Sequence, residues 1–264
     1  MNTMSDPILD IRGLTVTFGG GPKPVRALDG VDLALGRGEI VGLVGESGSG
    51  KSVTLRSILR LHPPKRSRIE GSIKVEGIDV TSLEGRALES FRGKTVSMVF
   101  QEPMLAMDPV YTVGQQITEA VRNHEKISAA DARARALEML TLVRIPSPER
   151  RLAAYPHEMS GGMRQRVVIA MALVCRPELL IADEPTTALD VTIQAQILTL
   201  IRELQQEIGC SVLLITHDLG VVAQSADEVA VMYLGRVVEH GPVAEVLKYP
   251  RHPYTQGLLR SLPS

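Results

Sequence analysis

Eight residues near the start of the chain match the pattern G-x-x-x-x-G-K-[ST]. They run from Gly45 to Ser52 and follow Ile40–Val44, an apolar run typical of a buried parallel strand. Glycines let the backbone wrap so that its N–H groups face phosphate oxygens, aided by the positive end of the following helix. Lys51 adds a positive charge, and the Ser52 hydroxyl can ligate Mg²⁺. The pattern predicts a nucleotide-phosphate site made of Gly45, Glu46, Ser47, Gly48, Ser49, Gly50, Lys51 and Ser52.

A pair of carboxylates follows a second apolar run, Leu179–Ala182. In an open α/β sheet, ligands bind at the carboxyl ends of the strands. Asp183 could therefore hold Mg²⁺, and Glu184 could polarise an attacking water. Taken alone, the pair is better explained by a strand that simply ends in solvent. Beside a phosphate loop, the pair favours nucleotide hydrolysis.

Two more polar residues follow predicted strands. His217 comes after Val212–Ile215, and Gln101 comes after Val96–Phe100. A histidine at this position could reach the terminal phosphate or orient the water, and the glutamine amide could contact both Mg²⁺ and water. Taken alone, His217 is better explained by a structural hydrogen bond, and Gln101 indicates little.

A serine and two glycines, Ser160–Gly162, open a predicted helix, Met163–Cys175. A helix start of this kind can bind a second anion, although capping of the helix by Ser160 alone is the simpler explanation. One nucleotide could not occupy both this site and Gly45–Ser52 of one chain if the intervening helices form a separate arm. A dimer, in which each chain lends its serine and glycines to the other's nucleotide, solves this problem.

The elements that must position these residues alternate between strand and helix. Ile8–Phe18 and Ile73–Val75 are further predicted strands, with a turn at Gly19–Pro22. Ser128 and Asp131 resemble a capping box before a helix. Asp190 can cap another helix, which Gly209 ends and whose apolar stripe is Ile193, Ile197, Leu200, Ile201, Leu204 and Ile208. The pattern predicts an α/β protein with a mainly parallel sheet and a helical insertion.

Composition excludes several classes of protein. The chain has 264 residues and a formal net charge of −1, which gives no electrostatic reason to expect a nucleic-acid partner. Cys175 and Cys210 lie far apart and suggest neither a disulfide framework nor a zinc site. The N-terminus lacks the features of a signal peptide. We expect a soluble cytoplasmic protein, or one that is attached to a membrane only through partners.

The motifs occur in the order found in ABC transporter ATPase subunits, which nearly the whole chain resembles. They are the Walker A loop Gly45–Ser52, Gln101, Ser160–Met163, Asp183 with Glu184, Ala188–Asp190 and His217. The resemblance implies a P-loop NTPase fold of the ABC ATPase type, with an antiparallel N-terminal β part. It implies one ABC ATPase domain, with a core of about 8–100 and 177–240, a helical sub-domain of about 101–176 and a tail of 241–264.

The resemblance also implies roles for single residues. Phe18 would stack on the adenine, and Gln101 would begin the loop that senses the membrane subunits. Ser160–Gly162 would contact the partner's ATP, and Asp190 would belong to the loop that crosses the dimer interface. His217 would be the switch histidine. The resemblance thus makes Glu184, His217 and Gln101 the catalytic group, and Ser52, Gln101 and Asp183 the Mg²⁺ ligands.

One motif departs from the usual LSGGQ signature, since Met159 and Met163 stand at its ends. The serine and glycines that would contact phosphate are intact, so we expect an active ATPase.

The stretches Tyr155–Met163, Ala182–Gln196 and Arg251–Leu259 resemble the peptide and nickel importer branch of this family. The branch implies dipeptide or oligopeptide import, with nickel or another small solute as the alternative. In this branch the tail leads into an extension whose cysteines can bind an iron–sulfur cluster. The chain ends at Ser264 with none of them, so we expect no such cluster here.

The branch further implies a set of partners. They are a second, different ATPase subunit, two transmembrane permeases and, indirectly, an extracytoplasmic solute-binding protein. The chain would lie peripherally on the cytoplasmic face of the inner membrane.

Two other classes of protein fit the sequence less well. A soluble ABC ATPase acting on DNA or ribosomes would call for tandem ATPase domains, a coiled coil or a basic face. A P-loop GTPase or kinase would leave the serine–glycine motif unexplained.

Overall fold

The computed structural model describes residues 6–19, 24–187 and 189–261. They divide into two compact units, Met1–Leu88 with Ser211–Ser264, and Glu89–Cys210. Most of the predicted turn Gly19–Pro22 and the motif residue Ala188 lie outside the described residues. Among the helices of the described ranges, none is both long and apolar enough to cross a membrane.

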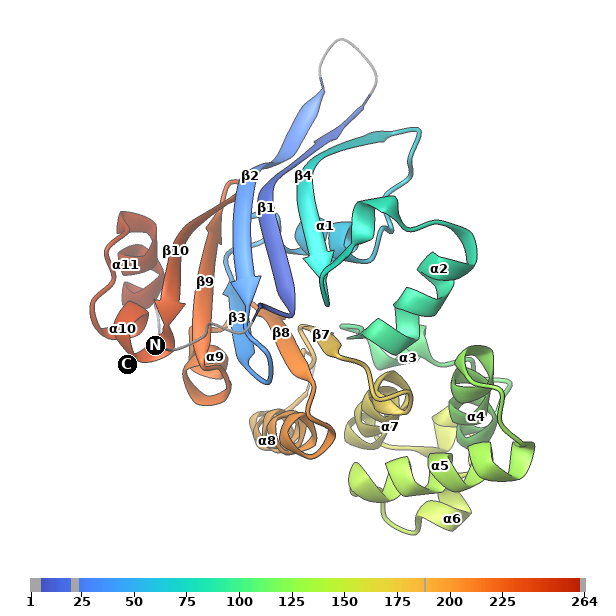
Figure 1. Cartoon of the computed structure of the whole chain (residues 1–264). Coiled ribbons are helices and arrows are strands. Elements are labelled where there is room, and N and C mark those ends of the chain that lie inside the picture. Colours follow the sequence, from blue (N-terminus) through green and yellow to red (C-terminus); the bar gives the residue numbers. More distant parts are fainter. Residues whose placement is uncertain (1–5, 20–23, 188, 262–264) are drawn as a thin grey trace. The chain divides into compact units, whose positions relative to one another are not determined.

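An antiparallel sheet in the first unit has the order β2-β1-β4-β5. Its strands are β1 (Leu9–Phe18), β2 (Val25–Leu35), β4 (Ser67–Val75) and β5 (Ile78–Asp79), and the first three run side by side in Figure 1. Buried and exposed positions alternate loosely along β1 and β2, as expected for a sheet with one face on a core. The sheet is the antiparallel N-terminal part that the family resemblance implied.

The first unit also contains the strands that carry the phosphate loop, in the order β10-β9-β3-β8. β3 (Ile40–Val44) pairs in parallel with β8 (Ser211–Thr216) and with β9 (Glu228–Tyr233), whereas β10 (Arg236–Pro242) is antiparallel to β9. Every residue of β3 and β8 is buried. Burial on both faces explains why these two strands read as uninterrupted apolar runs in the sequence.

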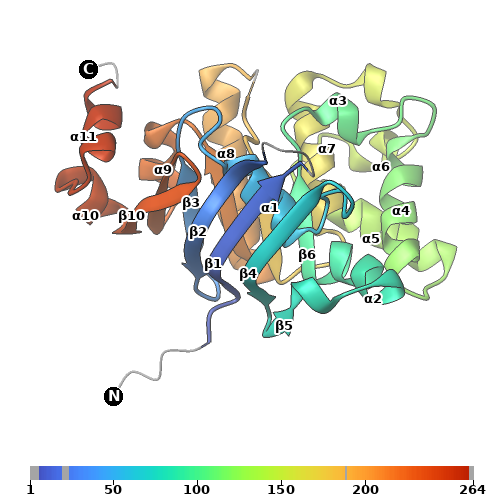
Figure 2. The same ribbon diagram turned by 90° about the horizontal axis from the view of Figure 1, so that it is seen from above.

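Helices accompany these strands. α1 (Lys51–Ile58) follows β3 directly, and α9 (Leu219–Ser225) follows β8. α10 (Val243–Lys248) and α11 (Pro253–Arg260) lie beside β10, in red in Figure 2. Short 3₁₀ turns of the chain are η1 (Val80–Ser82) and η3 (Pro156–Glu158), and α2 (Gly85–Ser90) leads into the turn η2 (Phe91–Thr95).

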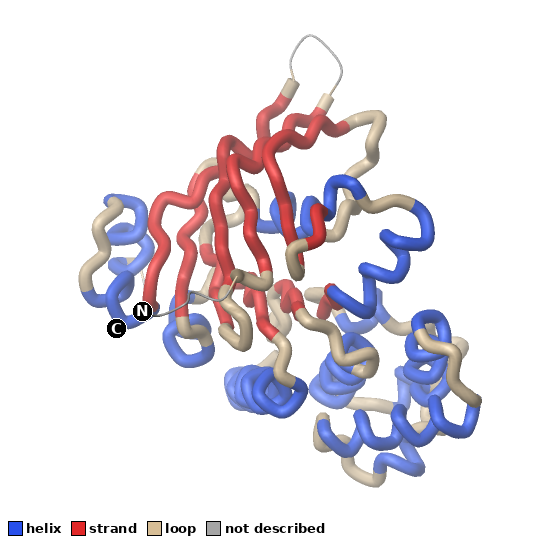
Figure 3. The backbone as a smooth tube through the Cα atoms, viewed as in Figure 1, coloured by secondary structure: helices blue, strands red, loops and turns tan. Residues whose placement is uncertain are grey.

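The second unit is mainly helical. Two parallel strands, β6 (Val96–Val99) and β7 (Leu179–Asp183), pair with each other. Among the described residues between these two strands, all regular elements are helices (Figure 3). These helices are α3 (Pro103–Ala106), α4 (Val113–His124), α5 (Ala129–Leu142), α6 (Pro148–Arg151) and α7 (Gly161–Leu173). After β7 comes α8 (Val191–Ile208). The expected helical insertion in an α/β protein is therefore confirmed.

Local signals account for the helix ends. Asp190 caps α8 by accepting a hydrogen bond from Ile193 N at 2.9 Å, and Gly209 ends it with φ 79°. Ser128 caps α5 as expected, but the Asp131 carboxylate accepts from the Ser128 hydroxyl at 2.7 Å instead of reaching back to the backbone. This start is therefore a serine cap and not the full capping box. Cys175, which follows the apolar run Val167–Val174, is half-buried.

Candidate nucleotide site

The glycine-rich loop joins the buried end of β3 to the start of α1. Gly48 and Gly50 have φ of 80° and 114°, a region that other residues rarely adopt. A Cβ at Gly45 would lie 2.3 Å from the carbonyl oxygen of Met232, so no larger side chain fits there. The loop therefore needs its glycines for both conformation and close packing.

Lys51 reaches back across the loop. Its Nζ donates hydrogen bonds to Gly45 O at 2.6 Å and Glu46 O at 3.0 Å, and the residue is only 7% exposed. These bonds hold the ammonium group at the loop. Ser52, next in the helix, is exposed.

The buried hydroxyl of Ser49 bears on whether the loop suits an anionic ligand. Ser49 Oγ is buried, and it finds no hydrogen-bond partner among the residues that the structure describes. Leaving a buried hydroxyl unpaired is costly, and phosphate oxygens would supply the acceptor. Around a Cβ built on Gly48 there is open space. These two observations fit a nucleoside triphosphate at the loop.

His217 and the loop leave neighbouring strands at the same level. Val44, the last residue of β3, is paired in register with Thr216, the last residue of β8. Gly45 and His217 are the next residues along the two strands, so the structure places the histidine beside the phosphate loop. His217 is exposed, and Asp218 caps α9 by accepting from Gly220 N at 2.7 Å.

Phe18 ends β1 in the same unit. Its ring meets that of His62 edge-on, with centroids 5.2 Å apart and an interplanar angle of 69°. Burial lowers the pKa of His62, and the ring hydrogen-bonds to the Ser57 hydroxyl at 3.1 Å. A neutral imidazole thus supports one edge of Phe18, which is half-buried. Adenine stacking on Phe18 stays a prediction.

The second unit brings the predicted acid and amide groups together. β6 and β7 pair in register at Val99 and Ala182, so Gln101 and Glu184 emerge from the same end. Gln101 Nε2 donates to Glu184 Oε2 at 3.0 Å, and Thr187 Oγ1 donates to the same oxygen at 3.0 Å. Thr187 has no role in the sequence-based predictions, although it belongs to the stretch that resembles the family.

Backbone strain marks the position of Glu184. Its φ is 44°, in the left-handed region that non-glycine residues seldom occupy. Such strain persists only where the surroundings determine the conformation, and it is frequent at functional sites. Asp183, one residue earlier, closes β7 and is half-buried. Glu184 is therefore fixed by backbone and side-chain contacts together.

The serine–glycine motif caps α7. Ser160 Oγ accepts from Met163 N at 3.3 Å, and Gly161 and Gly162 are the first two helical residues. A Cβ on Gly162 would lie 3.0 Å from Ile193 Cγ2, in the first turn of α8. The structure thus places Ser160–Gly162 against the helix that Asp190 caps.

Two hydrogen bonds between the phosphate loop and distant parts of the chain were not predicted. Gly235 N donates to Ser49 O at 2.8 Å, and Glu46 N donates to the hydroxyl oxygen of Tyr254 at 3.1 Å. No local sequence signal reports either contact, because both join residues far apart in the chain.

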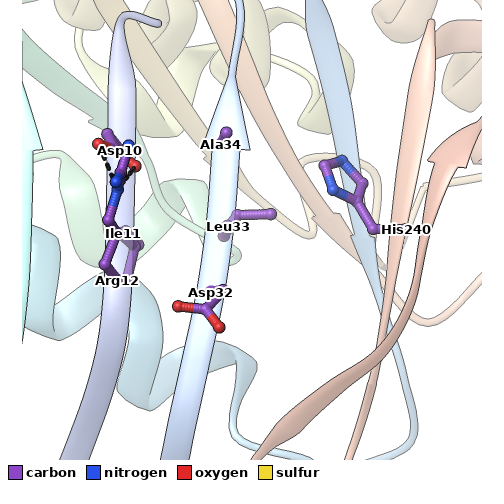
Figure 4. Close-up of a pocket in the computed structure, with 7 residues that line it drawn as sticks. All are labelled: Asp10, Ile11, Arg12, Asp32, Leu33, Ala34 and His240. Atoms are coloured by element: carbon purple, nitrogen blue, oxygen red, sulfur yellow. Dashed lines mark hydrogen bonds and ion pairs between the residues drawn. The ribbon is translucent and has the colours of Figure 1, made fainter.

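A separate pocket of about 320 Å³ lies over β1, β2 and β10 of the first unit. Figure 4 shows Asp10, Arg12, Asp32 and His240 around it. Arg12 Nε lies 2.9 Å from Asp10 Oδ2, and Asp32 Oδ1 accepts from Gly13 N at 2.7 Å. His240 Nε2 lies 3.0 Å from Glu228 Oε2. These polar groups support the strands, so we do not assign a function to the pocket.

Within the described ranges, no group of three or more His, Cys, Asp or Glu side chains could hold a metal ion. Mg²⁺ needs no such cluster, since proteins usually bind it through one or two carboxylates with substrate phosphates and water. The candidate ligands Ser52, Gln101 and Asp183 offer oxygen atoms, which fit this preference.

Two family models match the chain. The ABC transporter model matches residues 28–187, and the model named oligopeptide/dipeptide transporter, C-terminal region, matches residues 238–264. A probable peptide ABC transporter ATP-binding protein of Sinorhizobium fredii is 54% identical over 99% of this chain and 78% of its own length. The oligopeptide transport ATP-binding protein OppD of Bacillus subtilis is 54% identical over 97% of this chain and 72% of its own.

Solved structures agree with these matches. CbiO1 of Clostridium perfringens, part of an ABC transporter complex, has a TM-score of 0.80 at 28% identity, over 93% of this chain and 92% of its own. The dimeric ATP-binding cassette MJ0796 bound to ADP and Pi has a TM-score of 0.77 at 30% identity, over 89% and 98%. Sequence, fold and site geometry agree, and the chain belongs to the ABC transporter family of ATPases.

Proposed function

We propose that this ATPase energises an importer of dipeptides or oligopeptides. The observation that carries the cargo class is the match of residues 238–264 to the C-terminal region of oligopeptide and dipeptide transporters. Relatives named for peptide transport, more than half identical over nearly the whole chain, support it. Nickel or another small solute is the alternative cargo.

Each predicted residue has a part in the proposed ATP site. The loop Gly45–Ser52 cradles the phosphates, with Lys51 as its positive charge, and Phe18 stacks on the adenine. Ser52, Gln101 and Asp183 would hold Mg²⁺, which neutralises charge on the phosphates when it is bound. The buried Ser49 hydroxyl without a partner among the described residues supports this assignment.

Glu184 is the proposed base that orients and polarises the attacking water. Gln101 and Thr187 both donate to its Oε2 and so position the carboxylate that would accept a hydrogen bond from the water. Two donors on one oxygen also fix the carboxylate plane, so the base is positioned before the substrate arrives. His217, beside the phosphate loop, would stabilise the terminal phosphate.

Hydrolysis is proposed to require a partner ATPase. Ser160–Gly162 and Asp190 would face the partner's nucleotide, where the start of α7 offers N–H groups to phosphate. The MJ0796 cassette, whose structure is dimeric, supports a two-chain arrangement. We favour a heterodimer with a different ATPase, bound to two permeases at the cytoplasmic face of the membrane and supplied by a solute-binding protein.

Uptake into reconstituted vesicles tests this function. The chain is assembled with its partner ATPase, the permeases and the binding protein, and the vesicles receive ATP with labelled dialanine, a labelled pentapeptide or Ni²⁺. We expect ATP-dependent uptake of a peptide, and none when Lys51→Ala replaces the wild type. Uptake of Ni²⁺ without uptake of either peptide would show that the transporter imports nickel. ATP hydrolysis that no permease alters and no uptake accompanies would overturn the transport function.

A further inference from the structure

The C-terminal helix α11 contacts the phosphate loop directly. Tyr254, in its first turn, accepts a hydrogen bond from Glu46 N at 3.1 Å, across a sequence separation of 208 residues. Glu46 is the second residue of the loop and is exposed. The contact therefore links the region matched by the peptide-transporter C-terminal model to the region expected to bind ATP.

A second aromatic ring holds Tyr254 in place. The rings of Tyr254 and Tyr233 lie 4.2 Å apart between centroids, with an interplanar angle of 30°. Tyr233 ends β9, and two residues later Gly235 N donates to Ser49 O at 2.8 Å. The end of β9 and the start of α11 together support the loop at Glu46 and at Ser49.

Packing and capping fix α11 on the unit. Tyr254, Leu258 and Leu259 pack against a buried cluster that includes Val44, the residue before the loop. The Glu239 carboxylate of β10 accepts from Arg251 N at 2.8 Å and from His252 N at 3.0 Å, at the entry to the helix. Figure 2 shows α11 next to α10 and β10. The helix is thus anchored independently of the loop that it touches.

We propose that Tyr254 is a positioning residue that pre-orders the phosphate loop for nucleotide binding. The inference rests on the proposed ATP site and extends it to the C-terminal segment. A phosphate loop works by converging N–H groups, and ordering its backbone at the moment of binding costs conformational entropy. A loop held at Glu46 by Tyr254 has less entropy to lose, so it binds nucleotide more tightly.

Tyr254→Phe isolates the hydrogen bond, because it removes the hydroxyl and keeps the ring on Tyr233. A hydrogen bond of this kind changes affinity by about 2- to 10-fold. We expect the Kd for ADP and for ATP, measured calorimetrically on the full chain, to rise by about that factor. In the assembled transporter the KM for ATP should rise likewise while kcat stays unchanged, since no catalytic group is altered. Tyr249→Phe is the matched control, because it removes the hydroxyl of a tyrosine that is 66% exposed.

Amide hydrogen exchange distinguishes a loss of order in the phosphate loop from a general loss of stability of the chain. In the nucleotide-free chain, amides of residues 45–50 should exchange faster in Tyr254→Phe than in the wild type or Tyr249→Phe, while the melting temperature falls by no more than about 4 °C. Glu239→Ala, which frees the start of α11 without touching the loop, should have the same effect on exchange. Unchanged Kd and unchanged exchange in Tyr254→Phe would overturn the proposal. A wild-type chain that binds no nucleotide would instead overturn the proposed function.

Discussion

Gln101 and Glu184 are joined by a hydrogen bond of 3.0 Å between Nε2 and Oε2, although 83 residues separate them in the chain. The pairing of β6 with β7 produces this contact, since both residues follow the same end of the two strands. It fixes the position of Oε2 of the Glu184 carboxylate. The proposed hydrolysis depends on a Glu184 carboxylate that is held in this way.

Thr187 donates to the same oxygen of Glu184, and its loss should loosen the base. Hydrogen bonds to charged groups contribute about 1.5–3 kcal/mol when well formed. Because this pair is only half-buried, we expect Thr187→Val to lower kcat about tenfold with little change in KM for ATP. Steady-state hydrolysis by the assembled transporter measures both. Thr199→Val is the control, since that exposed hydroxyl serves only the helix carbonyl of Ala195. An equal loss in both variants would contradict a specific role for Thr187.

Lys51→Ala should abolish turnover and weaken nucleotide binding. The variant removes a buried charge-assisted donor, and such interactions are worth about 1.5–3 kcal/mol, which corresponds to about 10- to 100-fold in Kd. Calorimetric titration with ADP and ATP provides the measurement. Lys65→Ala, at an exposed lysine after two prolines, should bind as the wild type does. Retained hydrolysis in Lys51→Ala would refute the loop as the phosphate cradle.

Ser160 has two possible roles, and one substitution separates them. As a helix cap alone, its replacement affects only stability, by about 1 kcal/mol. As a contact to the partner's nucleotide, Ser160→Arg should leave binding at the chain's own loop intact and reduce hydrolysis at the shared site by more than tenfold. Ser160→Thr retains a capping hydroxyl and is the control. If Ser160→Arg hydrolyses ATP like Ser160→Thr does, the serine only caps α7.

His62 predicts a pH dependence of stability. Burial lowers the pKa of His62 in the folded chain below its ordinary value of 6.5. The unfolded chain therefore binds the proton first, so the contribution of the neutral ring is complete above about pH 6.5 and is lost as the pH falls through the folded pKa. The free energy of unfolding should decrease from pH 7 to pH 5 more in the wild type than in His62→Gln. Denaturant melts at both pH values test this, with His157→Gln, at an exposed histidine, as the control. Equal pH dependence in wild type and His62→Gln would show that other groups are responsible.

Strong local signals made part of the structure predictable. α8 begins after Asp190 and ends before Gly209, as its cap and C-terminal glycine indicated, and β3 was evident from its uninterrupted apolar run. α7 begins at Gly161, two residues before the predicted start, because the Ser160 cap outweighs the poor helix propensity of the glycines.

Other features depend on contacts that a single sequence does not display. β2 alternates strictly between buried and exposed positions only from Val31 to Leu35, and its first half, which includes Asp29 and Gly30, breaks the pattern. The candidate residues could be named from their motifs. The sequence did not reveal that Thr187 and Gln101 both donate hydrogen bonds to the same oxygen of Glu184. Nor did it reveal that Tyr254 touches Glu46, because that contact arises only when α11 packs on the core beside Val44.

The Glu184→Gln variant of the assembled transporter tests the central claim most directly. The amide keeps the shape of the side chain and cannot accept a proton from water. We expect phosphate release to fall by more than 100-fold while ATP binding persists and two nucleotides stay trapped in a stable ATPase dimer. Glu178→Gln, at an exposed glutamate just before β7, should retain the wild-type rate. Near-wild-type phosphate release from Glu184→Gln would contradict the account and place the catalytic base elsewhere.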